Sequence, residues 1–177
     1  MSVYVMVNGI PGNMGCMVAE TCVARGLKLV PYSLTGEIIE EKEKVVAGVK
    51  VELLNPSTRE NVIADVMKRY PDMICIDYTH PTAVNDNAVF YVKHGIPFVM
   101  GTTGGDRVAL QKLVEEKNHP SVIAPNMAKQ IVAFQTMIEF LATEFPTAFS
   151  GYKLSVVESH QKTKADTSGT AKSVVAS

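Results

Sequence analysis

Three glycines near the N-terminus, Gly9, Gly12 and Gly15, have the spacing of a turn that can hold a phosphate group. The apolar run before them predicts a buried strand, and residues 13–25 after them predict a helix. Glycines permit a tight turn close to a pyrophosphate, and the helix start supplies free N–H groups and a positive dipole end. The spacing departs from the common Gly-x-Gly-x-x-Gly pattern because Ile10 occupies one glycine position. We therefore expect nucleotide binding here; the alternative is a strand–helix turn that binds nothing.

The end of the second predicted strand bears on the choice of cofactor. A site specific for NAD usually has Asp or Glu near this point to bind the ribose 2′-hydroxyl, and the first acid here is Glu37. The hydroxyl groups of Ser33 and Thr35 suit a 2′-phosphate instead. The sequence therefore favours NADPH, and NADH stays the alternative because Glu37 could reach the ribose.

Short apolar runs alternate with helical patterns through the first part of the chain. Strands are expected at residues 3–7, 27–32, 73–76, 97–100 and 121–124, and helices at 13–25, 57–69, 82–94 and 106–117. Ser57-Thr58-Arg59-Glu60 has the form of a capping box. Residues 35–48 are charged and contain two glycines, which predicts a mobile loop with or without a short hairpin. This order predicts an α/β fold, a Rossmann-like, doubly wound parallel sheet that forms a dinucleotide-binding domain over residues 1–127.

The pattern changes after Asn126. A long helix over 128–144 carries an apolar stripe that we interpret as core packing: Ile131, Phe134, Ile138 and Leu141. A strand over 152–157, a polar loop and the start of a helix follow. One strand does not make a stable sheet, so residues 128–177 are expected to be an incomplete part of a mixed α+β substrate-binding and oligomerisation domain.

The composition excludes several classes of function. Lys and Arg total 17 against 18 Asp and Glu, whereas binding to a phosphate backbone needs a basic face, so nucleic acid is not expected as the main partner. No apolar run approaches the roughly 20 residues of a membrane span. The chain opens directly into an apolar strand without a secretory signal. Its cysteines, Cys16, Cys22 and Cys75, form no Cys-x-x-Cys pair, which favours buried reduced thiols. We expect a cytoplasmic protein with no metal site; the plastid stroma is the alternative if a transit peptide is removed.

Three further segments carry a family resemblance. Asp77-Tyr78-Thr79-His80-Pro81 and Gly101-Thr102-Thr103-Gly104 each follow a predicted strand, and ligands of open α/β sheets lie at such strand ends. The third segment runs from Glu158 to Ala171. In this order they resemble dihydrodipicolinate reductases, most closely the plant-type branch, from residue 3 to the end of the chain. The resemblance implies a tetramer that reduces a cyclic conjugated dicarboxylate, dihydrodipicolinate, to tetrahydrodipicolinate with NAD(P)H, in the diaminopimelate route to lysine.

The resemblance also implies roles for residues. His160 would donate the proton that completes the reduction, and Lys164 would stabilise the developing negative charge. A substrate carboxylate would be held by Gln161, Ser168, Gly169 and Thr170. Gln161 replaces a histidine common in bacterial members, and the loop before Ser168 is one residue shorter. Asp77 is either a ribose contact or a turn cap. The expected cofactor contacts are Gly9, Gly12, Asn13, Met14, Gly15, Ser33, Thr35, Asp77, Thr79, Gly101, Thr103 and Asn126.

Two other functions remain open at this stage. A truncated, non-catalytic NADP-binding relative would keep the glycine turn, although retention of His160 and Lys164 disfavours it. Another Rossmann oxidoreductase is the second alternative. A semialdehyde dehydrogenase would need a nucleophilic cysteine in its second domain, and no cysteine follows Cys75.

Overall fold

The structure is a computed structural model that describes residues 2–124, 126–153, 155–157, 159, 171 and 175. The chain divides into two units, residues 1–125 and 126–177. This division falls next to the domain boundary expected after residue 127.

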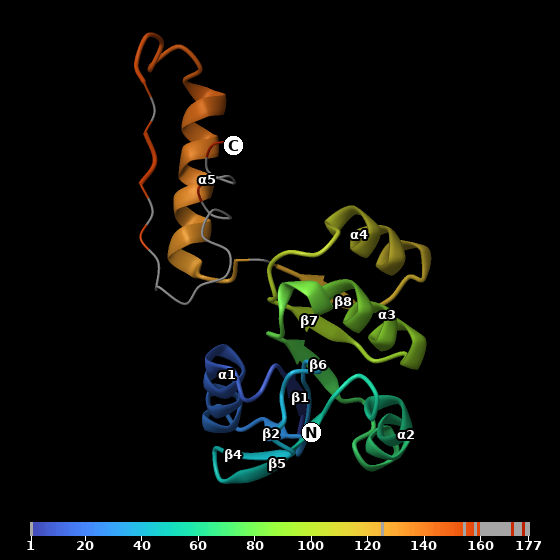
Figure 1. Cartoon of the computed structure of the whole chain (residues 1–177). Coiled ribbons are helices and arrows are strands. Elements are labelled where there is room, and N and C mark those ends of the chain that lie inside the picture. The colour runs from blue at the N-terminus through green and yellow to red at the C-terminus, as the bar shows by residue number, and fades with distance from the viewer. Residues whose placement is uncertain are drawn as a thin grey trace. The chain divides into compact units, whose positions relative to one another are not determined.

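The first unit is built on a five-stranded sheet in the order β2-β1-β6-β7-β8, in which every pair is parallel. Its strands are β1 (Tyr4–Asn8), β2 (Lys28–Leu29), β6 (Ile74–Asp77), β7 (Phe98–Met100) and β8 (Ser121–Ile123). The register pairs Asn8 with Asp77 and Asp77 with Met100. The turns after β1, β6 and β7 therefore begin at the same level of one sheet edge (Figure 1).

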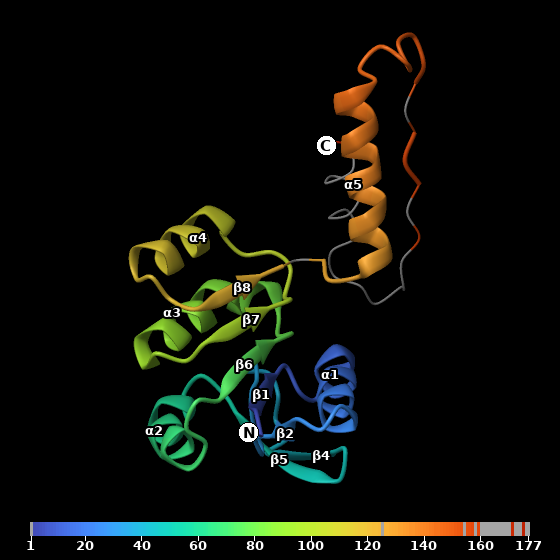
Figure 2. The same ribbon diagram turned by 180° about the vertical axis from the view of Figure 1, so that it is seen from behind.

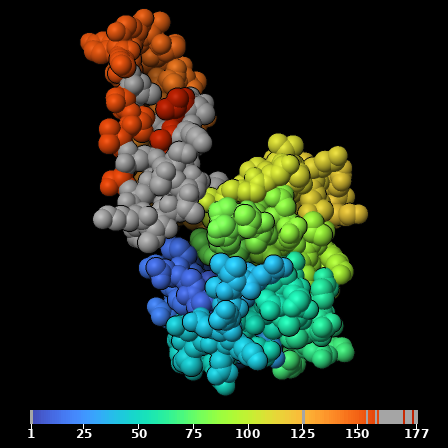
Figure 3. Space-filling view, in the orientation of Figure 1, coloured from blue at the N-terminus to red at the C-terminus, as the bar shows by residue number. Residues whose placement is uncertain are grey.

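Helices cover both faces of this sheet, which confirms the doubly wound Rossmann-like fold. They are α1 (Asn13–Ala24), α2 (Arg59–Arg69), α3 (Val84–His94), which follows the short 3-10 helix η1 (Pro81–Ala83), and α4 (Arg107–Glu116). The alternation of β1 explains the layers, because Val5 and Val7 pack with α1, whereas Met6 packs with α2, α3 and α4. The two opposite views show α1 alone on its side of the sheet (Figures 1 and 2). Helices α3 and α4 also pack against each other, as the adjoining green and yellow-green atoms show (Figure 3).

A second, three-stranded sheet contains the short hairpin that the sequence allowed within the loop expected over residues 35–48. It contains β3 (Tyr32–Leu34), β5 (Val49–Leu54) and β4 (Glu43–Val46) in that order, with β3 parallel and β4 antiparallel to β5. The predicted strand over 27–32 is thus divided between β2 and β3. Val46, Val51 and Leu53 are buried in the same core as α1. This packing holds the hairpin in place despite its charged, glycine-containing sequence.

The expected capping box at residues 57–60 does not form. Thr58 is the N-cap of α2 but makes no side-chain capping bond. The Asn55 Oδ1 atom accepts hydrogen bonds from the backbone N–H groups of Ser57 and Thr58, each at 3.1 Å. Glu60 accepts from Lys93 Nζ at 2.9 Å, and this bond lowers the pKa of Glu60. Asn55 and Lys93 therefore take the partners that the capping box would have used.

The second unit contains α5 (Lys129–Glu144), whose start is held by a 3.0 Å hydrogen bond from Ala128 N to Asn126 Oδ1. No residue of α5 is fully buried: Phe134 is 47% exposed, whereas the other residues of the predicted stripe, Ile131, Ile138 and Leu141, are half-buried. The stripe therefore forms no closed core within the described part of this unit. The described residues of 152–157 form no strand. A strand needs a hydrogen-bonded partner, and the described part of this unit provides none.

Candidate functional site

The glycine turn owes its three glycines to close backbone approaches. Gly9 has φ +100°, and a Cβ there would collide with the carbonyl oxygen of Tyr78. A Cβ on Gly12 would lie 2.8 Å from the Gly9 carbonyl oxygen, and one on Gly15 would lie 2.7 Å from it. The turn is closed by a hydrogen bond from Gly12 N to Gly9 O at 2.8 Å. The spacing read from the sequence is therefore required by the shape of the turn itself.

The turn leaves the start of α1 open to an anion. Gly12 is the N-cap and has no side chain to cap the first amides, which also lack partners within the helix. Asn13 and Met14 are exposed. The non-glycine residue in the turn, Ile10, is fully buried in the core beneath α1. The arrangement therefore has the exposed N–H groups and the dipole end that can hold a pyrophosphate.

The two hydroxyl residues at the end of β3 differ in their availability. Ser33 is fully buried, and its Oγ accepts a hydrogen bond from Ile10 N at 3.2 Å. Its hydroxyl therefore supports the glycine turn, and this geometry does not support the expected contact with a 2′-phosphate. Thr35 is 9% exposed, and Glu37 is exposed beyond it.

Asp77 is a buried anchor for the turns at the sheet edge, which corrects its expected contact with a ribose. Its side chain is fully buried. Oδ1 accepts from the Thr79 N–H at 3.0 Å, the Thr79 hydroxyl at 2.8 Å and the Thr102 hydroxyl at 2.6 Å. Oδ2 accepts from Asn87 Nδ2 at 3.0 Å and the Tyr91 hydroxyl at 2.6 Å. Of the two alternatives left open, the structure favours the turn cap.

The partners of Asp77 belong to a wider buried network that sequence reasoning missed. The Tyr91 hydroxyl accepts from Asn8 Nδ2 at 2.8 Å, and Asn8 Oδ1 accepts from Leu34 N at 2.8 Å. Arg59 Nη1 donates to Asn87 Oδ1 at 2.6 Å. The only sequence signal was the place of Asn8 at the end of the first apolar strand. The network joins the ends of β1, β3 and β6 to α2 and α3.

The turn after β7 packs directly on the turn after β6. A Cβ on Gly101 would collide with the ring of Tyr78. Gly101 N and Thr102 N donate to the Asp77 carbonyl oxygen at 2.9 and 3.2 Å. Arg107 Nη2 donates to the Thr102 carbonyl at 2.7 Å. The other terminal nitrogen, Nη1, is buried without a hydrogen-bond partner in the described part of the chain, and burial lowers the pKa of Arg107.

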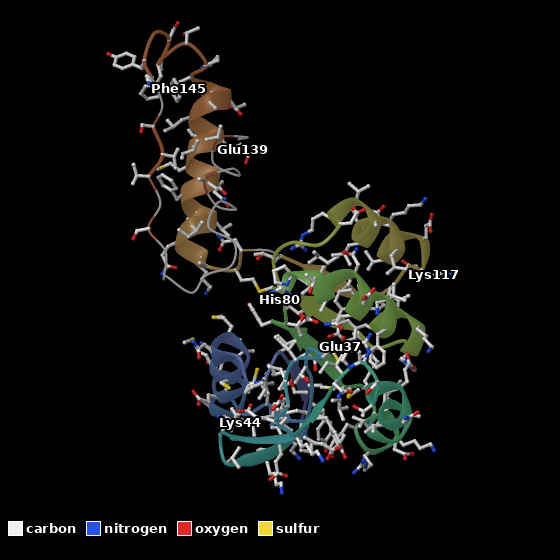
Figure 4. All side chains as sticks on the ribbon, in the orientation of Figure 1. Glu37, Lys44, His80, Lys117, Glu139 and Phe145 are labelled. Carbon is white, nitrogen blue, oxygen red and sulfur yellow. The ribbon has the colours of Figure 1, made fainter. Side chains whose placement is uncertain are left out.

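The remaining expected residues are divided between the units. Thr79 and Thr103 are half-buried beside these turns. His80 is exposed, and its Nδ1 lies 2.9 Å from the hydroxyl of Thr82 in η1 (Figure 4). Asn126 belongs to the second unit. The residues expected to bind or protonate the substrate lie outside the described residues: His160, Gln161, Lys164, Ser168, Gly169 and Thr170.

A groove of about 820 Å³ lies along β3 and β5, away from the glycine turn. Two lysines in its lining, Lys42 and Lys50, are outnumbered by five glutamates: Glu37, Glu40, Glu41, Glu43 and Glu52. Such a lining repels phosphate groups, so the start of α1 is the better place for a pyrophosphate.

The described residues offer little for metal binding or for chemistry that needs a reactive thiolate. They contain no group of three or more His, Cys, Asp and Glu side chains placed to hold a metal ion. Burial raises the pKa of each cysteine thiol, and that of Cys75 to about 12. Within the described parts of the chain, no helix is long and apolar enough to cross a membrane.

Comparison with known proteins identifies the same family that the sequence of the turns resembles. The family described as "Dihydrodipicolinate reductase, N-terminus" matches residues 3–127. A rice protein described as "Probable 4-hydroxy-tetrahydrodipicolinate reductase 1, chloroplastic" is 50% identical over 171 residues, which are 97% of this chain and 50% of that protein. An Arabidopsis thaliana protein, "4-hydroxy-tetrahydrodipicolinate reductase 1, chloroplastic", is 48% identical over 174 residues, which are 98% of this chain and 50% of that protein.

A solved structure has the same fold. It is described as "Dipicolinate bound Dihydrodipicolinate reductase from Paenisporosarcina sp. TG-14", and it matches with a TM-score of 0.60 and 24% sequence identity. The match covers 82% of this chain and 56% of that chain. This chain thus spans about half the length of the curated plant relatives that it matches. From the family match over residues 3–127 and the plant relatives, the chain belongs to the dihydrodipicolinate reductase family.

Proposed function

We propose that this protein reduces dihydrodipicolinate, a cyclic conjugated dicarboxylate, to tetrahydrodipicolinate with a nicotinamide dinucleotide, in the diaminopimelate route of lysine biosynthesis. The observation that carries the proposal is the meeting of three turns at one sheet edge. There the Gly9 backbone touches Tyr78, and the Tyr78 ring touches Gly101. The open start of α1 lies beside them and is suited to a pyrophosphate.

The residues of the first unit bind and orient the cofactor in this proposal. Gly12, Asn13, Met14 and Gly15 present backbone N–H groups to the pyrophosphate. The turns with Thr79, Gly101 and Thr103 surround the nicotinamide ring. When bound, the nicotinamide supplies a hydride. The fit rests on the uncapped amides at the start of α1 and on the glycine cradle there.

The substrate is handled by the segment near residue 160. We infer that Ser168, Gly169, Thr170 and Gln161 hold one carboxylate of the substrate. His160 donates the proton that completes the reduction, and Lys164 balances the negative charge that develops on the ring. The sequence of this segment and its order after the two strand-end turns support these roles.

The test of the function is turnover. Loss of NADPH absorbance should be followed with the cyclic substrate, and calorimetry should measure NADPH binding to the same preparation. Binding with substrate-dependent oxidation supports the reductase. Binding without oxidation in a chain of full family length would support the alternative, a non-catalytic NADP-binding relative.

We propose NADPH as the preferred cofactor. The support is the absence of an acid between the end of β3 and Glu37, together with the Thr35 hydroxyl at that strand end. Because Ser33 is used by the glycine turn, Thr35 is the hydroxyl that remains. Fluorescence titration should show tighter binding of NADPH than of NADH. Tighter NADH binding would instead show that Glu37 binds the ribose.

We propose that the protein is a homo-oligomer and that its compartment is the plastid stroma rather than the cytoplasm. Large apolar side chains along α5 are exposed, including Phe134, Met137 and Phe140 at 47%, 51% and 57%. Such a surface usually marks an interface. Plant relatives described as chloroplastic support the stroma. A monodisperse monomer by light scattering would contradict the oligomer.

A further inference from the structure

The carboxylate of Asp77 divides its hydrogen bonds between two parts of the molecule. Among the described residues, Oδ1 accepts from the turns at the sheet edge, at Thr79 and Thr102. Oδ2 accepts from side chains of α3, Asn87 and Tyr91. A buried carboxylate with five donors around it is costly to move, because each donor would lose its partner. Asp77 therefore transmits the position of α3 to the two turns.

The two side chains of α3 are themselves held on their far sides. Arg59 Nη1 donates to Asn87 Oδ1 at 2.6 Å, and the Arg59 guanidinium lies 4.6 Å from the centre of the Phe90 ring. Tyr91 is fully buried and accepts from Asn8 at 2.8 Å. Burial, with the nearby charge of Asp77, raises the pKa of Tyr91 well above its usual value, so the phenol keeps its proton. It therefore remains a donor to Asp77 at neutral pH.

The backbone carries this support onward to the glycine turn. The Tyr78 carbonyl lies against Gly9, and Tyr78 N donates to Asn8 O at 3.0 Å. A shift at Asp77 would therefore move the Tyr78–Thr79 peptide and, with it, the wall of the glycine turn. Thr79 also receives a direct bond from Asn87 Nδ2 at 3.1 Å. None of the α3 atoms in the network needs to touch a ligand to have this effect.

We propose that Tyr91 and Asn87 are positioning residues for the cofactor: through Asp77 they hold the Thr79 and Thr102 turns in the geometry that receives the nicotinamide half of the dinucleotide. This inference rests on the proposed function, because it assumes that these turns face the nicotinamide. The adenosine half lies on the β3 side of the glycine turn in a Rossmann fold. Removal of the Tyr91 hydroxyl should therefore weaken the whole dinucleotide more than its adenosine part.

The experiment compares Tyr91→Phe with Tyr32→Phe in the same chain. Both tyrosines are buried, and each variant deletes one hydroxyl: Tyr91 binds Asp77, whereas Tyr32 accepts from Arg69 Nη2 at 2.8 Å outside the network. Each preparation is titrated with NADPH and with adenosine 2′,5′-bisphosphate, and its melting temperature is measured. We expect Tyr91→Phe to weaken NADPH about fivefold or more, the factor that one lost hydrogen bond corresponds to. Adenosine 2′,5′-bisphosphate binding should change less than about twofold.

The control and a second variant decide between positioning and general destabilisation. Tyr32→Phe should lower the melting temperature to a similar degree without weakening NADPH. Asn87→Ser shortens the other side chain, and it should reproduce the selective loss even if Tyr91→Phe folds poorly. Equal losses for both ligands in Asn87→Ser, or wild-type NADPH affinity in either α3 variant, would overturn the positioning role. A wild-type chain that binds neither ligand would instead contradict the proposed function.

Discussion

Replacing Gly9 by alanine tests the contact that joins the glycine turn to the turn after β6. At Gly9 the backbone has φ +100°, and the new methyl group would overlap the carbonyl oxygen of Tyr78. The first cost is conformational, because an L-residue in a left-handed conformation loses about 1–2 kcal/mol. The second is steric, because the backbone must move apart at this point.

The size of the steric cost follows from the hydrogen bonds beside Gly9. Gly9 N donates to Leu34 O at 3.0 Å, and Tyr78 N donates to Asn8 O at 3.0 Å. Separation of the two turns strains both bonds, each worth about 1 kcal/mol. Together with the conformational cost, Gly9→Ala should destabilise the protein by about 3–4 kcal/mol. For a chain of this size, that loss lowers the melting temperature by about 10 °C.

Gly48→Ala is the matched control for this prediction. Gly48 has φ +76°, but no heavy atom lies within 4 Å of the position that its Cβ would take. It should therefore lose only the conformational part, about 1–2 kcal/mol. Thermal melts and NADPH calorimetry on both variants separate the two costs. Equal melting temperatures for the two variants, with NADPH affinity unchanged in Gly9→Ala, would refute the backbone contact as the basis of the site.

Three further predictions follow from the same description. Gly12→Val places a branched side chain against the Gly9 carbonyl at the start of α1, and calorimetry should show NADPH binding at least tenfold weaker, about 1.4 kcal/mol; unchanged affinity would mean that the pyrophosphate lies elsewhere. The pKa of about 12 for Cys75 means that its reactive thiolate forms only as the pH rises far above neutral. Thiol labelling of the native protein at pH 8 should therefore spare Cys75 until the chain is unfolded, and labelling as fast as that of half-buried Cys16 would contradict its burial. In a chain of full family length, His160→Gln should lower kcat by about 10²–10⁴-fold and leave NADPH affinity nearly intact; wild-type kcat across pH 6–8 would remove His160 from the role of acid.

The regular part of the fold could be predicted because periodicity reports burial. The alternation of apolar runs and helical patterns predicted the strands of the main sheet and the four helices around it. Helix α4 begins where the sequence placed it, and Asp106 caps it by accepting from Ala109 N at 3.0 Å. Strands β4 and β5 were predicted only as an optional short hairpin, because charged residues and Gly48 favoured a loop. Their burial depends on contact with α1, which is distant in sequence. The apolar stripe of α5 predicted a buried face, but a stripe does not identify the element that packs against it.

At the site, residue type predicted which turns matter but not where each side chain points. The glycine turn and the two strand-end turns meet as their positions after parallel strands require. The hydroxyl of Ser33 and the carboxylate of Asp77 are groups that could bind a cofactor. Both side chains are buried and hydrogen-bonded to other residues of the protein instead. Tyr91 was hidden in an ordinary helical pattern. Its role depends on a hydrogen bond across 14 residues of sequence, which no local pattern contains.

Mapping NADPH on the chain by NMR tests directly whether the glycine turn and the two strand-end turns bind the cofactor. Amide signals of ¹⁵N-labelled protein are followed during titration with NADPH. We expect the largest shifts at the glycine turn, residues 9–15, and at the turns with Thr79 and residues 101–103. Saturating NADPH without shifts at these turns, or with shifts confined to the acidic groove between Glu37 and Glu52, would contradict this expectation.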